Sequence, residues 1–315
     1  MDKDEFLTIV IGAGMAGLAC ATRLAEAGDK VIVFDKGRGP GGRMATRRVE
    51  IAGEAVSFDH GAQYFTARDP AFRTAVARWE QDGVVARWPA AGEDAWVGVP
   101  GMNAPLKAMA ERLDVRWNTR VHAISFEHNR WQVDTPAGRF TAVAVFVAVP
   151  AEQAHELVRG ISPAYAAQVA KVTSEPCWSV MAAFDAPLAI AADTLRAPGA
   201  DISWAARNSA KPGRSGTECW VLHASPERSR AIIDLPPDEA ASALLGDFFR
   251  QTGAAPCAPI HLAAHRWLYA LPRVQASQPY FYDYDICFGL VGDYWHSPRV
   301  EGAWLSGHTL ADQFD

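Results

Sequence analysis

The chain has 315 residues, 49% of them apolar and 21% charged, with a formal net charge of −6 and a pI near 5.9. This composition is typical of a globular protein with a large core, and the acidic balance argues against a nucleic-acid-binding protein, which usually presents a basic face. No apolar run reaches the roughly 18 residues that a membrane-spanning helix needs, so we expect neither nucleic acid nor a membrane among the partners.

The N-terminal residues predict a strand followed by a phosphate-binding turn. Residues 6–11 have the pattern of a buried parallel strand, and the sequence GAGMAG follows at once. Gly12 permits a tight turn, Gly14 lets the backbone approach a pyrophosphate, and Gly17 lets the next helix pack closely on the sheet. Free N–H groups and the positive end of the helix dipole then face the phosphate charge.

A helix and a second strand complete this unit. The helical pattern runs to about Ala27, and residues 31–34 form a strand that ends at Asp35. A carboxylate at the tip of this strand can accept both hydroxyls of a ribose, which disfavours a 2′-phosphate there. Because strand, glycines, helix, strand and acid occur in register, we expect a bound dinucleotide.

The stretch GGRMATR at residues 41–47 favours FAD over NAD as that dinucleotide. Arg43 follows a flexible glycine pair shortly after the acid-tipped strand. Its guanidinium can contact the pyrophosphate of an extended cofactor that lies along the sheet. The alternative is a surface loop that carries a solvated arginine.

The middle of the chain predicts further strands of the cofactor sheet and a separate antiparallel sheet. Residues 84–98 are predicted as strands that extend into a second lobe and 105–113 as a helix. Residues 115–117 and 119–126 are predicted to return towards the cofactor sheet, and 131–149 to form two strands around a turn at 136–138. From residue 171 to 270 the pattern predicts strands at 177–184, 202–207, 218–223 and 261–268, backed by helices at 226–233 and 237–251. We therefore predict a discontinuous FAD-binding domain of residues 1–68, 99–170 and 271–315, and a substrate domain of residues 69–98 and 171–270.

The C-terminal segment supplies a second half-site for the same cofactor. Residues 285–291 are predicted as a buried strand, followed by Gly292 and Asp293 and then by a helical segment that contains Gly302 and continues through Leu310. An aspartate after this strand can hold a ribityl hydroxyl. The start of the following helix can point N–H groups at the O2/N1 edge of a flavin. An NAD dehydrogenase has no need of such a distant half-site.

Several motifs together resemble a known family. They are GAGMAG, GGRMATR, FDHGAQYF at 58–65, Gly292-Asp293 and EGAW at 301–304. With these motifs the chain resembles the flavin-containing amine oxidase superfamily. The short length, SWAARNSAKPGR at 203–214 and AHRW at 264–267 make it similar to the renalase-like branch. The resemblance implies an α/β fold, with a Rossmann-type FAD-binding domain of the amine-oxidase and p-hydroxybenzoate-hydroxylase type and a second α+β substrate domain built on an antiparallel sheet.

Site residues follow from the motifs and the resemblance together. The expected cofactor-binding residues are Gly12, Gly14, Met15, Ala16, Asp35, Lys36, Gly42, Arg43, Met44, Gly61, Ala62, Gln63, Tyr64, Val121, Gly292, Asp293, Gly302 and Ala303. For the substrate we expect aromatic walls from Tyr64, Trp204, Trp267 and Trp295, and polar orientation of a carboxamide by Asn208 and His265. The alternative for the aromatic residues is that they pack the interface between the two lobes. His60 either satisfies a backbone carbonyl or has a functional role.

Cofactor chemistry is expected in place of acid–base or nucleophilic catalysis by side chains. The chain has no G-x-S-x-G, and His261 and His265 are four apart without the glutamate of an H-E-x-x-H motif, so we expect no metal. The flavin would carry the reaction, taking a hydride at N5 and passing electrons to O2 to give hydrogen peroxide. Cys287 lies inside the last predicted strand, where its thiol should pack in the sheet, so we expect noncovalent FAD.

Five scattered cysteines without a C-x-x-C motif fit reduced thiols and a cytoplasmic protein. The acidic start, Met1 to Glu5, leads straight into the first strand, so we expect no secretory leader. The expected partners are a small-molecule substrate and O2, and no protein partner is predicted.

Two main classes of function remain open. The renalase-like resemblance implies oxidation of the 2- and 6-dihydro isomers of NAD(P)H, which returns NAD(P)+. The alternative is a genuine amine oxidase, whose family often places a lysine near N5. Only Lys171 and Lys211, among six lysines, lie in the predicted second lobe, and Lys211 sits in a Lys-Pro-Gly turn expected to be exposed, which weakens the amine interpretation. A desaturase or other flavin oxidoreductase, and a non-enzymatic flavin-binding module, are the remaining possibilities.

Overall fold

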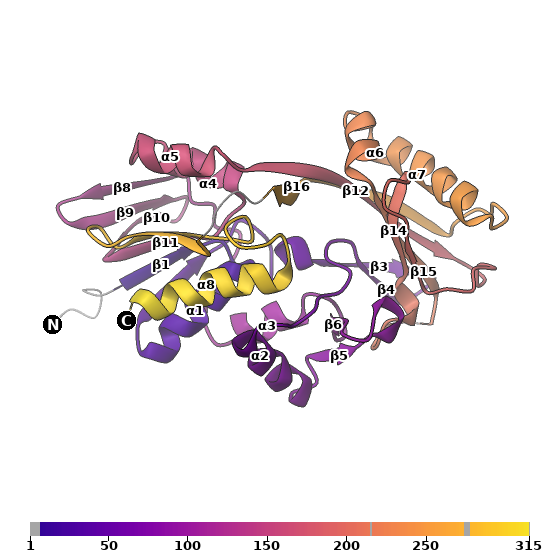
Figure 1. The fold of residues 1–315 in the computed structure, drawn as a ribbon, viewed down its shortest axis with the longest axis horizontal. Coiled ribbons are helices and arrows are strands. Elements are labelled where there is room, and N and C mark those ends of the chain that lie inside the picture. The colour runs from indigo at the N-terminus through magenta and orange to yellow at the C-terminus, as the bar shows by residue number, and fades with distance from the viewer. Residues whose placement is uncertain (1–6, 215, 274–277, 315) are drawn as a thin grey trace.

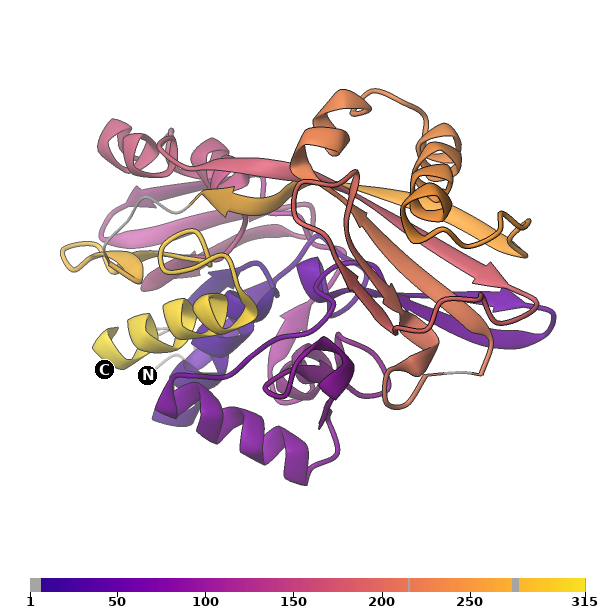
Figure 2. The same cartoon turned by 45° about the vertical axis from the view of Figure 1, so that its right-hand side comes forward.

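The computed structural model describes residues 7–214, 216–273 and 278–314. Two large sheets lie toward opposite ends of an elongated molecule, and the long strands of the second sheet reach back toward the first (Figure 1, Figure 2). The predicted α/β fold class is confirmed. The expectations for Met1 to Glu5 and for Phe6 lie outside the described residues.

The first sheet has the predicted parallel core. Its strand order is β17-β18-β11-β1-β2-β7, and every neighbouring pair is parallel except β17 and β18. The strands are β1 (Leu7–Ile11), β2 (Lys30–Phe34), β7 (Asp114–Arg116), β11 (Ala144–Val147), β17 (Tyr280–Asp283) and β18 (Phe288–Val291). The chain runs from β1 to β2 and then to β7 on one side of β1, and later adds β11 and β18 on the other side. The carboxyl ends of β1 and β11 therefore border a crevice of the kind in which α/β sheets bind ligands.

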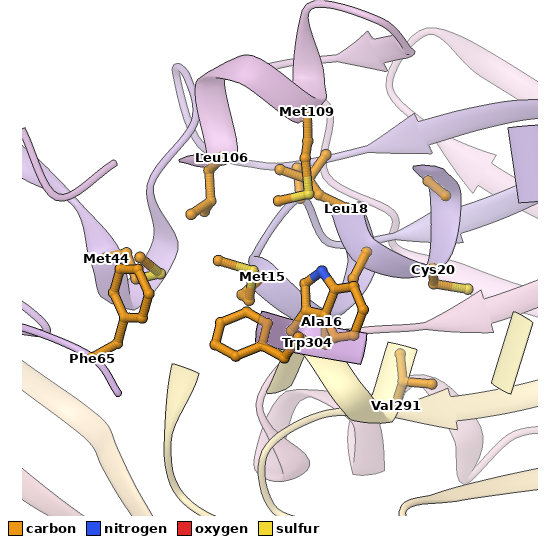
Figure 3. Packing of buried hydrophobic residues seen from close by; sticks show 14 of the residues in the cluster. Met15, Ala16, Leu18, Cys20, Met44, Phe65, Leu106, Met109, Val291 and Trp304 are labelled. Carbon is orange, nitrogen blue, oxygen red and sulfur yellow. The ribbon is translucent and has the colours of Figure 1, made fainter. Parts of the chain in front are cut away.

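Helices and a small meander cover the two faces of this sheet. On one face, α1 (Met15–Ala27) crosses α8 (Val300–Phe314), and apolar residues of both helices pack with Phe65, Leu106 and Val291 in one cluster (Figure 3). α1 ends at Gly28, whose φ of 105° is in the left-handed region that glycine tolerates best. The other face is covered by α4 (Ala151–Val158), α5 (Pro163–Val169) and the antiparallel strands β8 (Ala123–Glu127), β9 (Arg130–Thr135) and β10 (Gly138–Ala142).

The second sheet is antiparallel, as predicted, and its two faces have different partners. Its order is β13-β14-β15-β12-β16, with β12 (Thr173–Phe184), β13 (Thr194–Arg196), β14 (Ile202–Arg207), β15 (Glu218–Ala224) and β16 (His261–Arg273). Alternate residues such as Trp220 and Leu222 pack beneath α7 (Pro237–Thr252), near α6 (Pro226–Ala231). The intervening residues, such as Val221, pack against Val56 and Phe58 from the first half of the chain. One face of the sheet is therefore left for the cofactor side of the molecule.

Two hairpins and two helices connect the sheets. The hairpins are β3 (Thr46–Ile51) with β4 (Glu54–Asp59) and β5 (Val85–Arg87) with β6 (Trp96–Gly98), and the helices are α2 (Pro70–Gln81) and α3 (Ala104–Ala110). Three single turns of 3₁₀ helix complete the elements: η1 (Gly42–Met44), η2 (Pro89–Ala91) and η3 (Asn208–Ala210). α2 packs on α8, with the rings of Phe72 and Trp304 5.3 Å apart. The division into two discontinuous domains stays a prediction.

The structure corrects the last predicted strand. β18 begins at Phe288 instead of residue 285, because the chain makes a turn in which Cys287 has a φ of 49°. The thiol of Cys287 therefore lies in a turn before the sheet and does not pack inside it.

Helices α2, α4 and α5 were not predicted from the sequence. Within the described ranges, no helix combines the length and apolarity needed to cross a bilayer.

A glycine at the crossing of α1 and α8 sets how closely these helices approach. A Cβ added to Gly307 would overlap the carbonyl oxygen of Ala16, whereas a Cβ added to Gly246 in α7 would meet nothing within 4 Å. We expect Gly307→Ala to destabilise the protein by about 1–3 kcal/mol through overpacking. The matched change Gly246→Ala should instead stabilise it by about 0.5–1 kcal/mol through helix propensity. Denaturant unfolding of both variants measures this, and equal effects would contradict the close-crossing interpretation.

Candidate active site

A cavity of about 680 Å³ lies between the carboxyl ends of the parallel strands and the second sheet. Gly14, Ala148 and Gly292, which follow β1, β11 and β18, border it from one side. Trp204 of β14 and Trp267 of β16 border it from the other. The cavity therefore occupies the crevice predicted by the topology of the first sheet, closed by the second.

The glycine turn after β1 has the shape of an anion cradle. Gly12 has a φ of 109°, and a Cβ there would lie 2.7 Å from the carbonyl oxygen of Ala148. A Cβ on Gly14 would meet nothing within 4 Å, so this glycine faces open space in the cavity wall. No side chain caps the N-terminus of α1, and Met15 and Ala16 of its first turn line the cavity. The turn and the helix dipole together suit a pyrophosphate.

Asp35 holds the glycine turn in place from outside the cavity lining. Its two carboxylate oxygens each accept a backbone N–H at 2.6 Å, from Ala13 and from Gly37. Each oxygen has a further lone pair, so Asp35 keeps the capacity to accept ribose hydroxyls. Lys36 is exposed and donates to Gln153 at 2.8 Å, and Val121 is buried in the apolar cluster on the other face of the sheet. Neither borders the cavity.

An ion pair joins the 41–47 stretch to the C-terminal motif. The guanidinium of Arg43 donates to both oxygens of Asp293, at 2.8 and 2.7 Å, and both residues line the cavity. The sequence predicted separate roles for them, on a pyrophosphate and on a ribityl hydroxyl. In the structure they pair with each other and so tie the 41–47 stretch to the end of β18. Met44 and Ala303 also line the cavity, whereas Gly42 and Gly302 are not part of its lining.

The loop after β4 forms the adjoining wall. A Cβ on Gly61 would overlap the carbonyl oxygen of Arg43, and the N–H of Ala62 donates to that oxygen at 2.8 Å. The side chain of Gln63 donates to the carbonyls of Asp59 and Gly61. These bonds place Gly61, Ala62, Gln63 and Tyr64 side by side along the cavity lining.

Three predicted aromatic residues form cavity walls. The ring centroids of Tyr64 and Trp204 are 5.3 Å apart. The indole N–H of Trp267 donates to the carbonyl of His60 at 2.8 Å, which fixes that ring. All three line the cavity. His60 itself is buried outside the lining, with its ring 5.2 Å from that of Trp267, and its Nδ1 has no hydrogen-bond partner among the described residues.

Three other predicted substrate residues lie elsewhere. Asn208 is fully buried, and its amide donates to the carbonyl of Ser57 at 2.7 Å and accepts from the N–H of Asp59, so we reassign it to bracing the end of β4. His265 packs edge-on against Trp267, 4.3 Å away, and stands behind the wall. Trp295 is buried against Tyr294 on the far side of the first sheet. Asn208 lies in η3 and Trp295 in the turn after β18, so no strand directs them into the cavity, whereas His265 shares a strand face with Trp267 and lies beside it outside the lining.

Sequence reasoning missed several residues of the lining, and two of them, Cys177 and His223, lie on the second sheet beside predicted walls. Cys177 pairs across the strands with Trp267, and His223 pairs with Trp204, so all four lie on the cavity face of the second sheet. Period-two alternation along β12 and β15 could have identified them. Burial raises the pKa of the Cys177 thiol to about 12. Burial, helped by the nearby charge of Lys211, lowers the pKa of His223 to about 4, so both are neutral at pH 7.

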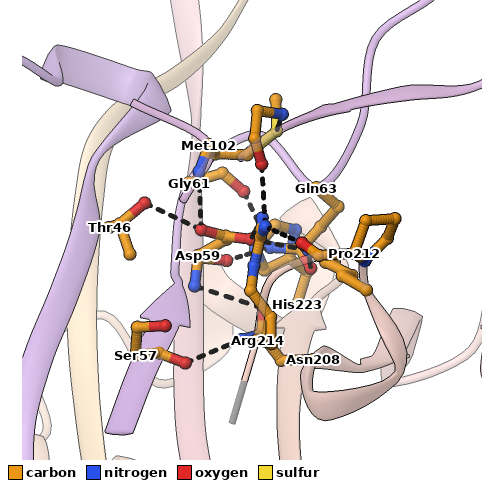
Figure 4. Close-up of polar contacts among 12 residues, drawn as sticks. Thr46, Ser57, Asp59, Gly61, Gln63, Met102, Asn208, Pro212, Arg214 and His223 are labelled. Atoms are coloured by element: carbon orange, nitrogen blue, oxygen red, sulfur yellow. Dashed lines mark hydrogen bonds and ion pairs between the residues drawn. The ribbon is translucent and has the colours of Figure 1, made fainter. Parts of the chain in front are cut away.

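A buried charge cluster stands behind this wall (Figure 4). Asp59, Lys211 and Arg214 have side chains no more than 1% exposed, and a carboxylate oxygen of Asp59 lies 2.6 Å from Arg214 and 3.2 Å from Lys211. Lys211 also donates to Gln63 of the cavity wall at 3.2 Å. The expectation that Lys211 lies in an exposed turn is therefore wrong: the turn folds inward because Asp59 supplies a counter-charge.

This cluster holds two cations and one anion. Burial would raise the pKa of Asp59, but the charges of Lys211 and Arg214 outweigh it and hold that pKa well below its usual range. Burial and the neighbouring Arg214 lower the pKa of Lys211 to about 8, against the raising effect of Asp59. Lys211 therefore loses its proton more readily than an exposed lysine does. Within the described part of the chain, no group of three or more histidines, cysteines and acids could hold a metal ion.

Comparisons with known proteins agree with this geometry. A family model described as a NAD(P)-binding Rossmann-like domain matches residues 10–79, and one described as flavin containing amine oxidoreductase matches residues 87–313. An opine oxidase polypeptide of Rhizobium meliloti (strain 1021) is 39% identical over 88 residues, which cover 24% of this chain and 19% of that protein. The chain thus matches less than a fifth of the length of this curated relative.

Solved structures extend the likeness to the whole fold. A protein of Exiguobacterium sp. 255-15 described as a candidate protoporphyrinogen oxidase is similar with a TM-score of 0.78 at 14% identity, covering 98% of both chains. A putrescine oxidase variant is similar with a TM-score of 0.73 at 15% identity, again over 98% of both chains. At such identities the likeness shows the fold alone.

Removing the anion of the buried cluster should be strongly destabilising. Asp59→Asn keeps the shape but leaves Lys211 and Arg214 as unpaired buried cations, so we expect a loss of about 3–5 kcal/mol in the free energy of unfolding. The control Asp134→Asn breaks an exposed pair with Arg139 and should change stability far less. Urea unfolding at pH 7 compares the variants. A similar, small loss in both would show that the cluster is not a determinant of the fold.

Proposed function

Because the chain belongs to the flavin-containing amine oxidoreductase family, we propose that it binds FAD and oxidises the 2- and 6-dihydro isomers of NAD(P)H. In the proposed reaction a hydride leaves the dihydronicotinamide ring, NAD(P)+ is returned, and O2 takes the two electrons and two protons to form hydrogen peroxide. One of those protons comes from solvent. Such a reaction removes a misreduced cofactor and restores the usable form.

Four features of the residues around the cavity fit FAD. The open space at Gly14, the uncapped start of α1 and the paired Arg43 suit a pyrophosphate, and Asp35 retains acceptor capacity for a ribose. Bound FAD would supply hydride acceptance at N5 and transfer of electrons to O2. Gly292 and Asp293 at the end of β18, with Ala303 in the first turns of α8, are placed to hold the flavin end.

The observation that supports this choice of substrate is that the carboxylates around the cavity already have hydrogen-bond or ion-pair partners. The lining contains four arginines and two carboxylates, an excess of two positive charges. Asp293 is paired with Arg43, and Glu301 accepts the backbone N–H groups of Arg68 and Asp69, so both carboxylates are engaged. A cationic amine would therefore enter a positively charged cavity whose acids are already paired. An anionic dinucleotide with an uncharged ring fits the same surroundings.

The neutral wall residues suit a dihydronicotinamide ring. Tyr64, Trp204 and Trp267 can enclose a planar ring and exclude water, and His223 and Gln63 can hydrogen-bond its carboxamide. Oxidation of this ring removes a hydride from carbon and no proton from nitrogen, so the wall needs no general base. The protein's contribution is then to hold the donor carbon in position and keep the site dry.

One observation favours the alternative, an amine oxidase. Lys211 is buried, touches Gln63 of the wall and has a pKa near 8, so it can exchange a proton close to the cavity. It does not itself line the cavity, and its charge would repel an ammonium group. We therefore keep amine oxidation as the second candidate.

The proposed FAD is noncovalent. Cys177 is the cysteine in the cavity lining, and burial raises its thiol pKa to about 12, so little reactive thiolate is present at neutral pH. Cys287 lies in a turn outside the lining. All five cysteines are free, in keeping with the proposal of a reducing, cytoplasmic compartment.

An anaerobic mixing experiment tests the proposed reaction. The purified flavin-loaded protein is mixed with 2- or 6-dihydro-NAD(P), ordinary NADH, or a panel of amines including putrescine, while the visible absorbance of the flavin is followed. We expect rapid bleaching by a dihydro isomer and recovery with stoichiometric hydrogen peroxide on admission of O2. Bleaching by amines alone would establish the alternative, and bleaching by nothing in the panel would remove both.

Acid precipitation tests how the flavin is held. We expect the yellow colour to pass into the supernatant, because burial raises the pKa of the Cys177 thiol to about 12 and Cys287 lies outside the cavity lining. Colour retained in the pellet of the wild type but released from Cys177→Ala would instead show a covalent bond at Cys177.

A further inference from the structure

Arg196 stands at the edge of the cavity with no assigned role. It is the last residue of β13, the edge strand of the second sheet, and it is exposed while also bordering the cavity. We propose that its guanidinium is the subsite for the phosphate nearest the nicotinamide, and that it selects a phosphorylated nicotinamide nucleotide over uncharged or cationic substrates. This inference rests on the proposed function and names the group by which that substrate is recognised.

The guanidinium sits over the two aromatic walls. Its central carbon lies 5.2 Å from the ring of Trp204 and 5.9 Å from the ring of Tyr64, and one nitrogen donates to the Tyr64 hydroxyl. Among the described residues, no carboxylate lies within ion-pair distance of Arg196, so its charge is uncompensated. The stacking leaves the remaining N–H donors of the planar fork available to a ligand.

The backbone that carries Arg196 is fixed. Arg196 pairs with Trp204 in the antiparallel register of β13 and β14. The hydroxyl of Thr194, two residues earlier, donates to the carbonyl of Ala90 at 2.7 Å. The carbonyl of Asp193 accepts the N–H of Arg207 at 2.8 Å. Arg196 and two of the three residues before it are thus tied to neighbouring elements, so little ordering of the backbone is needed when a ligand binds.

The positions of the aromatic walls and of Arg196 match the order of ring, ribose and phosphate in a nicotinamide nucleotide. In that class of molecule a single ribose separates the flat ring from its phosphate. A ring held between Tyr64, Trp204 and Trp267 would place the phosphate just beyond the walls, where Arg196 stands over their edges. Arginine can bind phosphate through two parallel N–H bonds, which adds geometry to charge. The same cation would repel an ammonium substrate.

Nicotinamide mononucleotide and nicotinamide riboside form a matched pair of probes, because they differ only in the phosphate. Their binding to the oxidised, flavin-loaded protein is measured through perturbation of the flavin absorbance, with no turnover required. We expect the wild type to bind the mononucleotide about tenfold more tightly than the riboside. Arg196→Met should remove this preference by weakening mononucleotide binding. It should not weaken riboside binding, because the riboside has no phosphate and its cationic ring gains nothing from a nearby guanidinium. Arg196→Lys should restore part of the preference.

Two controls separate charge recognition from general damage. Arg87→Met removes another exposed arginine, stacked 3.9 Å from the ring of Trp96 but outside the cavity lining, and should keep the tenfold preference. Raising the ionic strength should weaken mononucleotide binding in the wild type and leave it unchanged in Arg196→Met. An equal loss for both probes in Arg196→Met would mean that the arginine only props up the walls, and would overturn the proposal.

Failure of this subsite and failure of the proposed reaction give different results. If the wild type prefers the mononucleotide through Arg196 but its flavin is not bleached by any dihydronicotinamide, the anion subsite is supported and the proposed reaction is contradicted. If its flavin is bleached but both probes bind equally, the proposed reaction is supported and the subsite is contradicted.

Discussion

The buried carboxylate of Asp59 is the interaction on which the rest of the site depends. It accepts hydrogen bonds from Thr46, from the backbone N–H of Met102 and from the cations Lys211 and Arg214, so segments far apart in sequence meet at one anion. A carboxylate leaves water only when such partners replace its hydration. The loop that lines the cavity begins at this residue, and Gln63 returns to its backbone carbonyl. The same contacts that compensate the burial of one charge therefore fix the wall against which a cofactor and a substrate would be placed.

The opposite side of the cavity is shaped by backbone constraints instead of charge. Gly12 adopts a positive φ against Ala148, Gly61 lies on the backbone of Arg43, and Gly14 leaves space where a side chain would project. The Arg43–Asp293 pair then ties this side to the end of β18. The two sides differ in what would break them. Added volume would close the glycine side, whereas loss of a charge would open the Asp59 side.

The elements that were predicted correctly are those whose conformation is determined by residues close together in the sequence. The glycine turn, α1, β2 with Asp35 and all four predicted strands of the second sheet follow from conformational needs and alternation within a few residues, and the structure has them. Lys211 and Asn208 were misplaced because their partners, Asp59 and Ser57, are about 150 residues away in the chain. No local pattern distinguishes a Lys-Pro-Gly turn that meets a buried acid from one that meets water. Cys177 and His223 were overlooked for a different reason. The alternation that places them beside Trp267 and Trp204 is visible in the sequence, but the sequence does not show which face of the second sheet borders the cavity.

The excess of positive charge around the cavity bears on how a cycle would finish. A dihydronicotinamide ring is uncharged, whereas the oxidised ring that it becomes is a cation. Hydride transfer between two bound groups leaves the total charge in the cavity unchanged, so the surroundings need not oppose the transfer itself. In the proposed cycle, once the electrons had passed to O2, the cationic ring would lie near the charges of Lys211 behind the wall and Arg196 at the edge, with the carboxylates of the lining already paired. Repulsion of the ring then favours its departure, while attraction for the phosphate is the same before and after oxidation. Under the proposed function, the charge distribution would admit the reduced substrate through its phosphate and disfavour retention of the oxidised ring. An amine substrate, which is cationic from the start, would not receive this bias.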